Sequence, residues 1–132
     1  MDKVALLELL RSHLDGVLAV YAFGSRIQGT ADEGSDLDLA VLVRGYADPL
    51  TLWDLAGDAA DIAGCPVDLL DLRRASTVMQ QQVLTKGERW WALPGSEAGL
   101  FECAVLSEKL ELDRARAPLL RDIERDGRVY GR

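Results

Sequence analysis

The chain is expected to fold as a small α/β domain, a mixed β-sheet flanked by helices, because short apolar runs alternate with amphipathic segments. Apolar runs of strand length occur at 17–23, 37–43 and 66–71, and the run at 89–92 is either a fourth strand or an extended arm. At 132 residues the chain has room for one hydrophobic core and not for two. Residues 1–132 are therefore interpreted as a single domain.

Apolar residues recur at helical spacing near the start of the chain, with charged residues between them. They are Val4, Leu7, Leu10 and Leu14, and they predict an amphipathic helix over 3–14.

Two further helices are indicated by their start and stop residues. Thr51 with Asp54 three residues later resembles a capping box, and the apolar stripe that follows ends at Gly64. Ser76 is expected to cap another helix that runs to Gly87.

The last third of the chain is predicted to be helical. Cys103, Leu106 and Leu110 fall on one face of a helix that is expected to end near Arg116, and Pro118 begins a last helical piece. These C-terminal helices, about 98–126, are expected to pack either on the core or on a partner.

The adjacent Trp90 and Trp91 cannot both be buried on one face of a regular strand, because side chains alternate. One is predicted to lie in the core and the other to be exposed, as an anchor for a partner protein or for adenine stacking.

Composition narrows the class of protein. The net charge is −7, from 22 acidic and 15 basic residues, which argues against a broad nucleic-acid surface and fits a small substrate carried with a metal or a basic partner. No apolar run approaches the roughly 20 residues that span a membrane. Cys65 and Cys103 have no metal-ligand spacing and are expected to be buried free thiols, which favours the cytoplasm.

Chemistry is indicated around the second strand. Asp36 and Asp38 are one residue apart at its start, so both side chains point to one face. Two like charges at this distance repel each other unless a cation offsets them. The Gly24-Ser25 turn shortly before them offers backbone N–H groups to an anion. Asp68 interrupts the next apolar run and would be a third carboxylate from a neighbouring strand.

Each of these features is commonplace alone. An Asp-x-Asp pair usually marks a solvated strand edge, turns use Gly-Ser routinely, and Asp68 could pair with Arg73 or Arg74. Together they describe an anion cradle beside a platform for Mg²⁺, which is what a nucleoside triphosphate requires.

The run from Gly24 through Ser35 and Asp36 to Leu42 resembles the signature of the DNA polymerase β-like nucleotidyltransferase superfamily. The short length and the segment 66–71 resemble its minimal nucleotidyltransferase branch, which includes MntA-type antitoxins paired with HEPN-domain ribonuclease toxins. The similarity covers nearly the whole chain.

The resemblance implies the fold of that superfamily and a role for each matching residue. Asp36, Asp38 and Asp68 would bind two Mg²⁺ ions and perform catalysis, while the nucleotide would be held by Gly24, Ser25, Arg26 and Ser35. The expected reaction moves AMP from ATP to a tyrosine hydroxyl of the cognate toxin. The expected partners are ATP and the toxin, with which the chain could form a hetero-oligomer, and neither membrane nor nucleic acid is expected.

One departure leaves alternatives open. Many members have an Arg before the second glycine of the motif, where this chain has Gln28 before Gly29. A first alternative is an antitoxin that neutralises its toxin by binding alone. A second is transfer to a small molecule, and a third is action on RNA ends.

Overall fold

The computed structural model describes residues 2–24 and 36–126, with side chains in the last helix only as far as Arg114 and without that of Leu112. The elements, in chain order, are α1 (Lys3–His13), β1 (Val17–Phe23), β2 (Leu37–Val43), α3 (Pro49–Ala63), β3 (Val67–Asp71), the 3-10 turn η1 (Leu72–Arg74), α4 (Thr77–Lys86), β4 (Glu88–Ala92) and α5 (Glu97–Asp126). In this part of the chain the strands form one sheet in the order β3-β2-β1-β4. Strands β2 and β3 are parallel and the other neighbours are antiparallel, so the predicted mixed α/β fold is confirmed.

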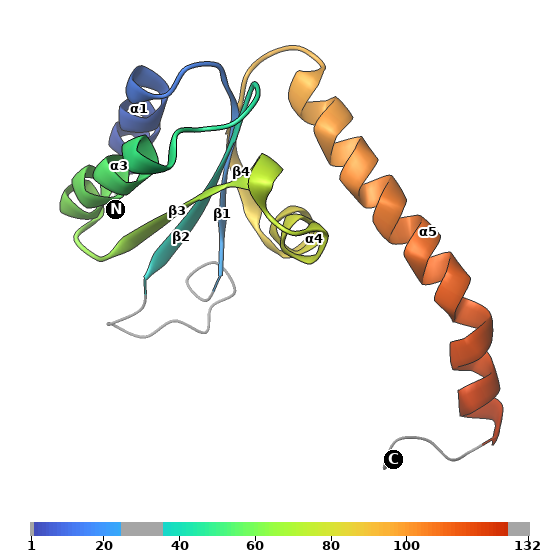
Figure 1. Ribbon diagram of the computed structural model, residues 1–132. Helices are drawn as coiled ribbons and strands as arrows, with labels where there is room; N and C mark the ends of the chain where they lie inside the picture. The colour runs from blue at the N-terminus through green and yellow to red at the C-terminus, as the bar shows by residue number, and fades with distance from the viewer. Residues whose placement is uncertain (1, 25–35, 127–132) are drawn as a thin grey trace.

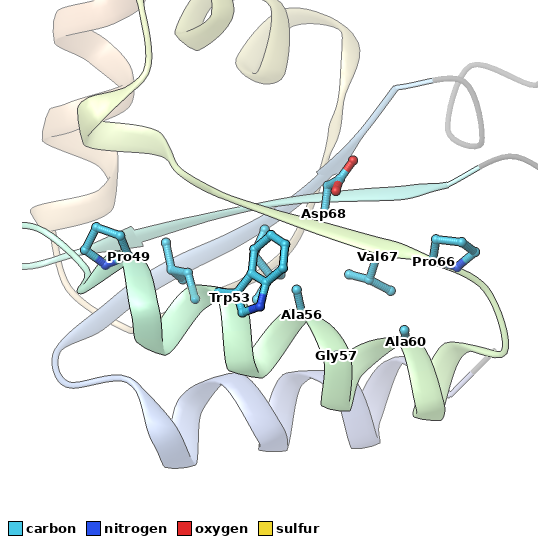
Figure 2. A pocket seen from close by; sticks show the side chains of 10 residues that line it. Pro49, Trp53, Ala56, Gly57, Ala60, Pro66, Val67 and Asp68 are labelled. Atoms are coloured by element: carbon cyan, nitrogen blue, oxygen red, sulfur yellow. The ribbon is translucent and has the colours of Figure 1, made fainter.

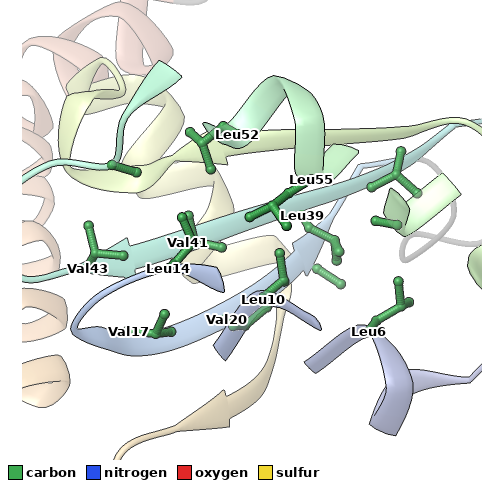
Figure 3. Packing of buried hydrophobic residues seen from close by; sticks show 14 of the residues in the cluster. Leu6, Leu10, Leu14, Val17, Val20, Leu39, Val41, Val43, Leu52 and Leu55 are labelled. Carbon is green, nitrogen blue, oxygen red and sulfur yellow. The ribbon is translucent and has the colours of Figure 1, made fainter. Parts of the chain in front are cut away.

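Helices cover both faces of the sheet. Helices α1 and α3 pack on one face, and α4 with the first turns of α5 packs on the other (Figure 1). Leu39 and Val41 of β2 belong to the first cluster of buried residues, which Figure 3 shows, whereas Leu42 belongs to the second. Because both faces are buried, β2 is an almost continuous apolar run rather than an alternating one.

The buried stripe of α1 is displaced from the predicted one. Leu6 and Leu10 are fully buried and Leu14 follows them in the same cluster, whereas Val4 is 65% exposed. Residues four apart share one side of a helix, and Val4 lies off the side that Leu6 and Leu10 define.

Helix α3 begins two residues before the predicted Thr51. The true N-cap is Asp48, whose side chain accepts hydrogen bonds from the backbone N–H of Thr51 at 3.0 Å and from its hydroxyl at 2.9 Å. Pro49 occupies the first turn, where its missing N–H costs nothing because that group has no partner in a helix.

Helix α5 is one helix of 30 residues, so the predicted end near Arg116 and new start at Pro118 were wrong. A proline removes one helical hydrogen bond, but the Ala, Leu and Arg residues around it favour helix strongly. No helix within the described ranges combines the length and the apolarity that crossing a membrane requires.

Among the side chains of α5 that the structure describes, those in its first turns pack on the sheet. Ala98 and Val105 are buried, and the buried Tyr21 hydroxyl donates a hydrogen bond to Glu102 at 2.9 Å. Burial and this acceptor raise the pKa of Tyr21, which keeps the hydroxyl a donor. Cys103, predicted to be buried, is exposed, because it lies on the flank of α5 that does not meet the sheet.

The prediction for Trp90 and Trp91 was also wrong, because both are partly buried against the cluster under α1. The register between β1 and β4 shifts between Val20 and Tyr21, which is a bulge in β4 at Trp90. A bulge interrupts the alternation of side chains. Lys3 lies 4.8 Å from the ring centre of Trp90 and Arg11 lies 4.3 Å from that of Trp91, so two cations of α1 cover the pair.

Candidate active site

Parallel pairing of β2 with β3 brings two of the predicted carboxylates side by side. Asp38 of β2 is the register partner of Asp68 of β3. Opposite residues of paired strands point to the same face, and here that face is the one covered by α4. Figure 2 shows the Asp68 side chain on the side of β3 that faces away from α3.

Among the described residues, no cation compensates the charges at this point of the sheet. Asp38 is partly buried, and its pKa is raised first by burial, then by the charge of Asp68 and then by that of Asp36. Asp36, two residues before Asp38, is exposed. Among the described residues, none of the three takes part in an ion pair.

Gly24 brings the backbone at the end of β1 against the same carboxylate. Its φ is +85°, and a β-carbon at this position would overlap an Asp38 carboxylate oxygen and lie 3.2 Å from the carboxyl carbon. Only glycine combines this dihedral angle with this approach. Ser25, Arg26 and Ser35, the other residues predicted to hold the nucleotide, lie outside the described residues.

The cluster suits a cation that is shared with a substrate. Within 2–24 and 36–126, no three His, Cys, Asp or Glu side chains are grouped closely enough to hold a metal ion by themselves. Mg²⁺ takes one or two carboxylates and completes its shell with phosphate oxygens and water. The carboxylate oxygens of Asp38 and Asp68, whose charge no cation of the described ranges offsets, fit that requirement.

Asp71 has a different role, as a cap. It is 6% exposed and accepts hydrogen bonds from the N–H of Ala47 at 2.8 Å and from that of Arg73 at 3.1 Å. Arg74 lies 3.6 Å from it, so this arginine neutralises Asp71 and not Asp68. The Arg73 guanidinium donates to the Val43 carbonyl at 3.3 Å. Neither arginine therefore compensates the carboxylate cluster.

A groove that sequence reasoning missed lies between α3 and β3, on the other side of β3 from the Asp68 carboxylate (Figure 2). It has a volume of about 650 Å³ and is lined by Pro49, Leu52, Trp53, Ala56, Gly57, Ala60, Pro66, Val67, Asp68 and Leu69. Trp53 is 79% exposed at its rim. The sequence feature that could have indicated this groove is a helix face of small residues next to Trp53, a tryptophan that is not buried in the core.

The chain matches known proteins over most of its length. The family model described as polymerase beta, nucleotidyltransferase, matches residues 5–91, which reach from α1 into β4. The protein adenylyltransferase MntA of Shewanella oneidensis, strain MR-1, is 36% identical over 123 residues, which is 93% of this chain and 88% of that protein.

Solved structures are similar as well. A crystal structure of a toxin–antitoxin with AMP-PNP has a chain that superposes with a TM-score of 0.76 and 35% identity, over 94% of this chain and 99% of that one. A structure of the tri-AMPylated Shewanella oneidensis HEPN toxin in complex with MNT antitoxin has a chain with a TM-score of 0.68 and 32% identity, over 91% of this chain and 93% of that one. With its carboxylates on two parallel strands beside a glycine turn, this chain belongs to the polymerase beta nucleotidyltransferase family, in the branch that contains MntA.

Proposed function

We propose that this chain is an antitoxin that transfers AMP from ATP to a tyrosine hydroxyl of a cognate HEPN-type toxin. The observation that carries the proposal is the juxtaposition of Asp38 and Asp68, with Asp36 beside them and no cation among the described residues to compensate them. The likeness to MntA over 93% of the chain supports the choice of a protein as acceptor. The cytoplasm, which supplies ATP and keeps thiols reduced, suits the free Cys65 and Cys103.

Two Mg²⁺ ions, held by Asp36, Asp38 and Asp68, would neutralise the triphosphate and polarise the α-phosphate. Gly24, with Ser25, Arg26 and Ser35, would bind the triphosphate. Asp68, on the edge strand β3, would act as the base that accepts the proton of the tyrosine hydroxyl.

In this reaction the phenol oxygen forms a bond to the α-phosphorus, and the bond from that phosphorus to the bridging oxygen of the β-phosphate breaks. Pyrophosphate leaves in line with the attack. The carboxylates would act by holding cations beside the transferring group, since they are themselves anions and cannot offset the negative charge that develops on it.

The test is transfer to a HEPN-type toxin, which the proposal expects to be encoded beside this chain. Incubation of the two purified proteins with ATP and Mg²⁺ is expected to add about 329 Da per AMP to the toxin, read by mass spectrometry. Asp38→Asn is expected to abolish the addition, and Asp15→Asn, an exposed carboxylate elsewhere, to leave it intact. An unmodified toxin that wild type and Asp38→Asn neutralise equally would instead establish inhibition by binding alone.

A further inference from the structure

The edge of the sheet beside the carboxylates offers a free hydrogen-bonding row. Strand β3 is the first strand in the order β3-β2-β1-β4, and in the described part of the chain nothing pairs with its outer side. The Pro66 carbonyl accepts from the Leu37 N–H of β2 at 2.9 Å. Backbone groups alternate in direction along a strand, so those of Val67 and Leu69 point outward.

Side chains at this edge alternate between two surroundings. Val67 and Leu69 belong to the face covered by α3 and line the groove, whereas the Asp68 side chain lies on the opposite face with Asp38. A segment that adds to β3 would follow the same alternation. Its residue opposite Asp68 would face the carboxylates, and the two flanking residues would enter the groove.

The groove has walls that suit such flanking residues. Ala56, Gly57 and Ala60 provide a floor of small residues on α3, and the exposed Trp53 provides an apolar rim. The solvent side of α3 carries three exposed aspartates and no basic residue: Asp54, Asp58 and Asp61. Charge complementarity therefore favours a segment with basic residues near its apolar ones.

We propose that the groove between α3 and β3 binds the acceptor segment of the protein substrate as an added strand, which rests on the function proposed above. The segment carries a tyrosine opposite Asp68, apolar residues on each side of it in the groove, and basic residues toward the aspartates of α3. The tyrosine hydroxyl then meets the α-phosphate on the carboxylate face of β3, while the flanking apolar residues fill the groove on the other face. The groove is thus a site of acceptor specificity.

The test is to fill the groove without touching the carboxylates. A β-carbon at Gly57 meets nothing within 4 Å, and leucine favours helix over glycine, so Gly57→Leu is expected to fold. The matched control is Ser12→Leu, which adds the same side chain at an exposed position of α1. With the full toxin as acceptor, Gly57→Leu is expected to lower kcat/KM for AMP transfer at least about tenfold, as loss of a central contact does. Calorimetric binding of ATP with Mg²⁺ is expected to stay within about twofold of wild type, which is under 0.5 kcal/mol.

Each other outcome separates this inference from the proposed function. If the wild-type protein modifies no toxin, both the proposed AMP transfer and the proposed role of the groove are wrong. If Gly57→Leu transfers AMP normally, only the role of the groove is wrong. Weakened ATP binding by this variant would assign the groove to the nucleotide, and an altered oligomeric mass with normal transfer would assign it to self-association. If Gly57→Leu fails to fold, Trp53→Ala is the second test of the groove. Truncation of this exposed side chain is expected to raise KM for the toxin about tenfold, and an unchanged KM would contradict the inference.

Discussion

The two ends of β3 each carry an aspartate, and the two carboxylates have opposite surroundings. Asp71 is buried, and two backbone N–H groups and an arginine satisfy it. Asp68 is exposed, and its near neighbour is another carboxylate, Asp38. A carboxylate that stabilises a fold is surrounded by hydrogen-bond donors, whereas a carboxylate that binds a cation or a proton during function lies among like charges.

The largest expected effect is a loss of transfer activity on substitution of Asp68, the aspartate to which we assign no structural role. Asp68→Asn is expected to lower AMP transfer to the toxin by about 10³-fold or more, because it removes a proposed metal ligand, which would be worth several kcal/mol in the transition state. The free energy of unfolding should change by less than about 0.5 kcal/mol, since this exposed group has no donor to lose. Transfer kinetics by mass spectrometry and urea unfolding measure the two quantities. Activity within tenfold of wild type would contradict the role assigned to Asp68.

The second effect concerns stability at the other end of the strand. Asp71→Ala is expected to lower the free energy of unfolding by about 3 kcal/mol, because the N–H groups of Ala47 and Arg73 lose their buried acceptor. Urea unfolding measures the loss, and ATP binding by the folded protein should survive. A loss below about 1 kcal/mol would show that water replaces the carboxylate.

A third comparison uses two glycines with similar dihedral angles. Gly24 has φ +85° and lies against Asp38, whereas Gly45 has φ +77° and a β-carbon there would meet no atom within 4 Å. Alanine at either position is expected to cost about 1 kcal/mol of backbone strain. Only Gly24→Ala should also weaken ATP binding, because its methyl group displaces the Asp38 carboxylate. If calorimetry measures equal ATP affinities for the two variants, Gly24 has no role in nucleotide binding.

The smallest effect is on stability without metal. The raised pKa of Asp38 means that the folded protein binds this proton more tightly than the unfolded chain does. Its stability should therefore fall as the pH rises from the usual carboxyl range through the raised pKa. In a chelator at neutral pH, Asp38→Asn is expected to melt at a higher temperature than wild type. Added Mg²⁺ should raise the Tm of wild type and leave that of the variant unchanged, and a lower Tm for Asp38→Asn in chelator would contradict this account.

Much of the fold followed from local patterns. The strand runs were recognisable because both faces of the sheet are covered, and the Gly64 and Gly87 stops marked the ends of α3 and α4. The errors occurred where tertiary packing overrides local rules. The bulge at Trp90 placed both tryptophans on one face, and α5 continued through Pro118.

For the site, the spacing of Asp36 and Asp38 predicts a shared face, which stays a prediction because β2 begins at Leu37 and Asp36 lies just before it. The charge of Asp68 within an apolar run is enough to single that residue out. The hydrogen-bond donors around Asp71 could not be predicted from the sequence, because Ala47 lies 24 residues away and contacts Asp71 only in the folded chain. The groove beside Trp53 is likewise a product of how α3 packs on β3.

By itself, the sequence determined the alternation of strands and helices and which residues of one strand point the same way, because a strand has a period of two that depends on nothing beyond its neighbours. Only the tertiary structure decided that β3 pairs parallel to β2, in the register that sets Asp68 against Asp38 and leaves Asp71 among donors. Register depends on the burial of Val67 and Leu39 beneath α3 together, and burial is a property of the assembled core.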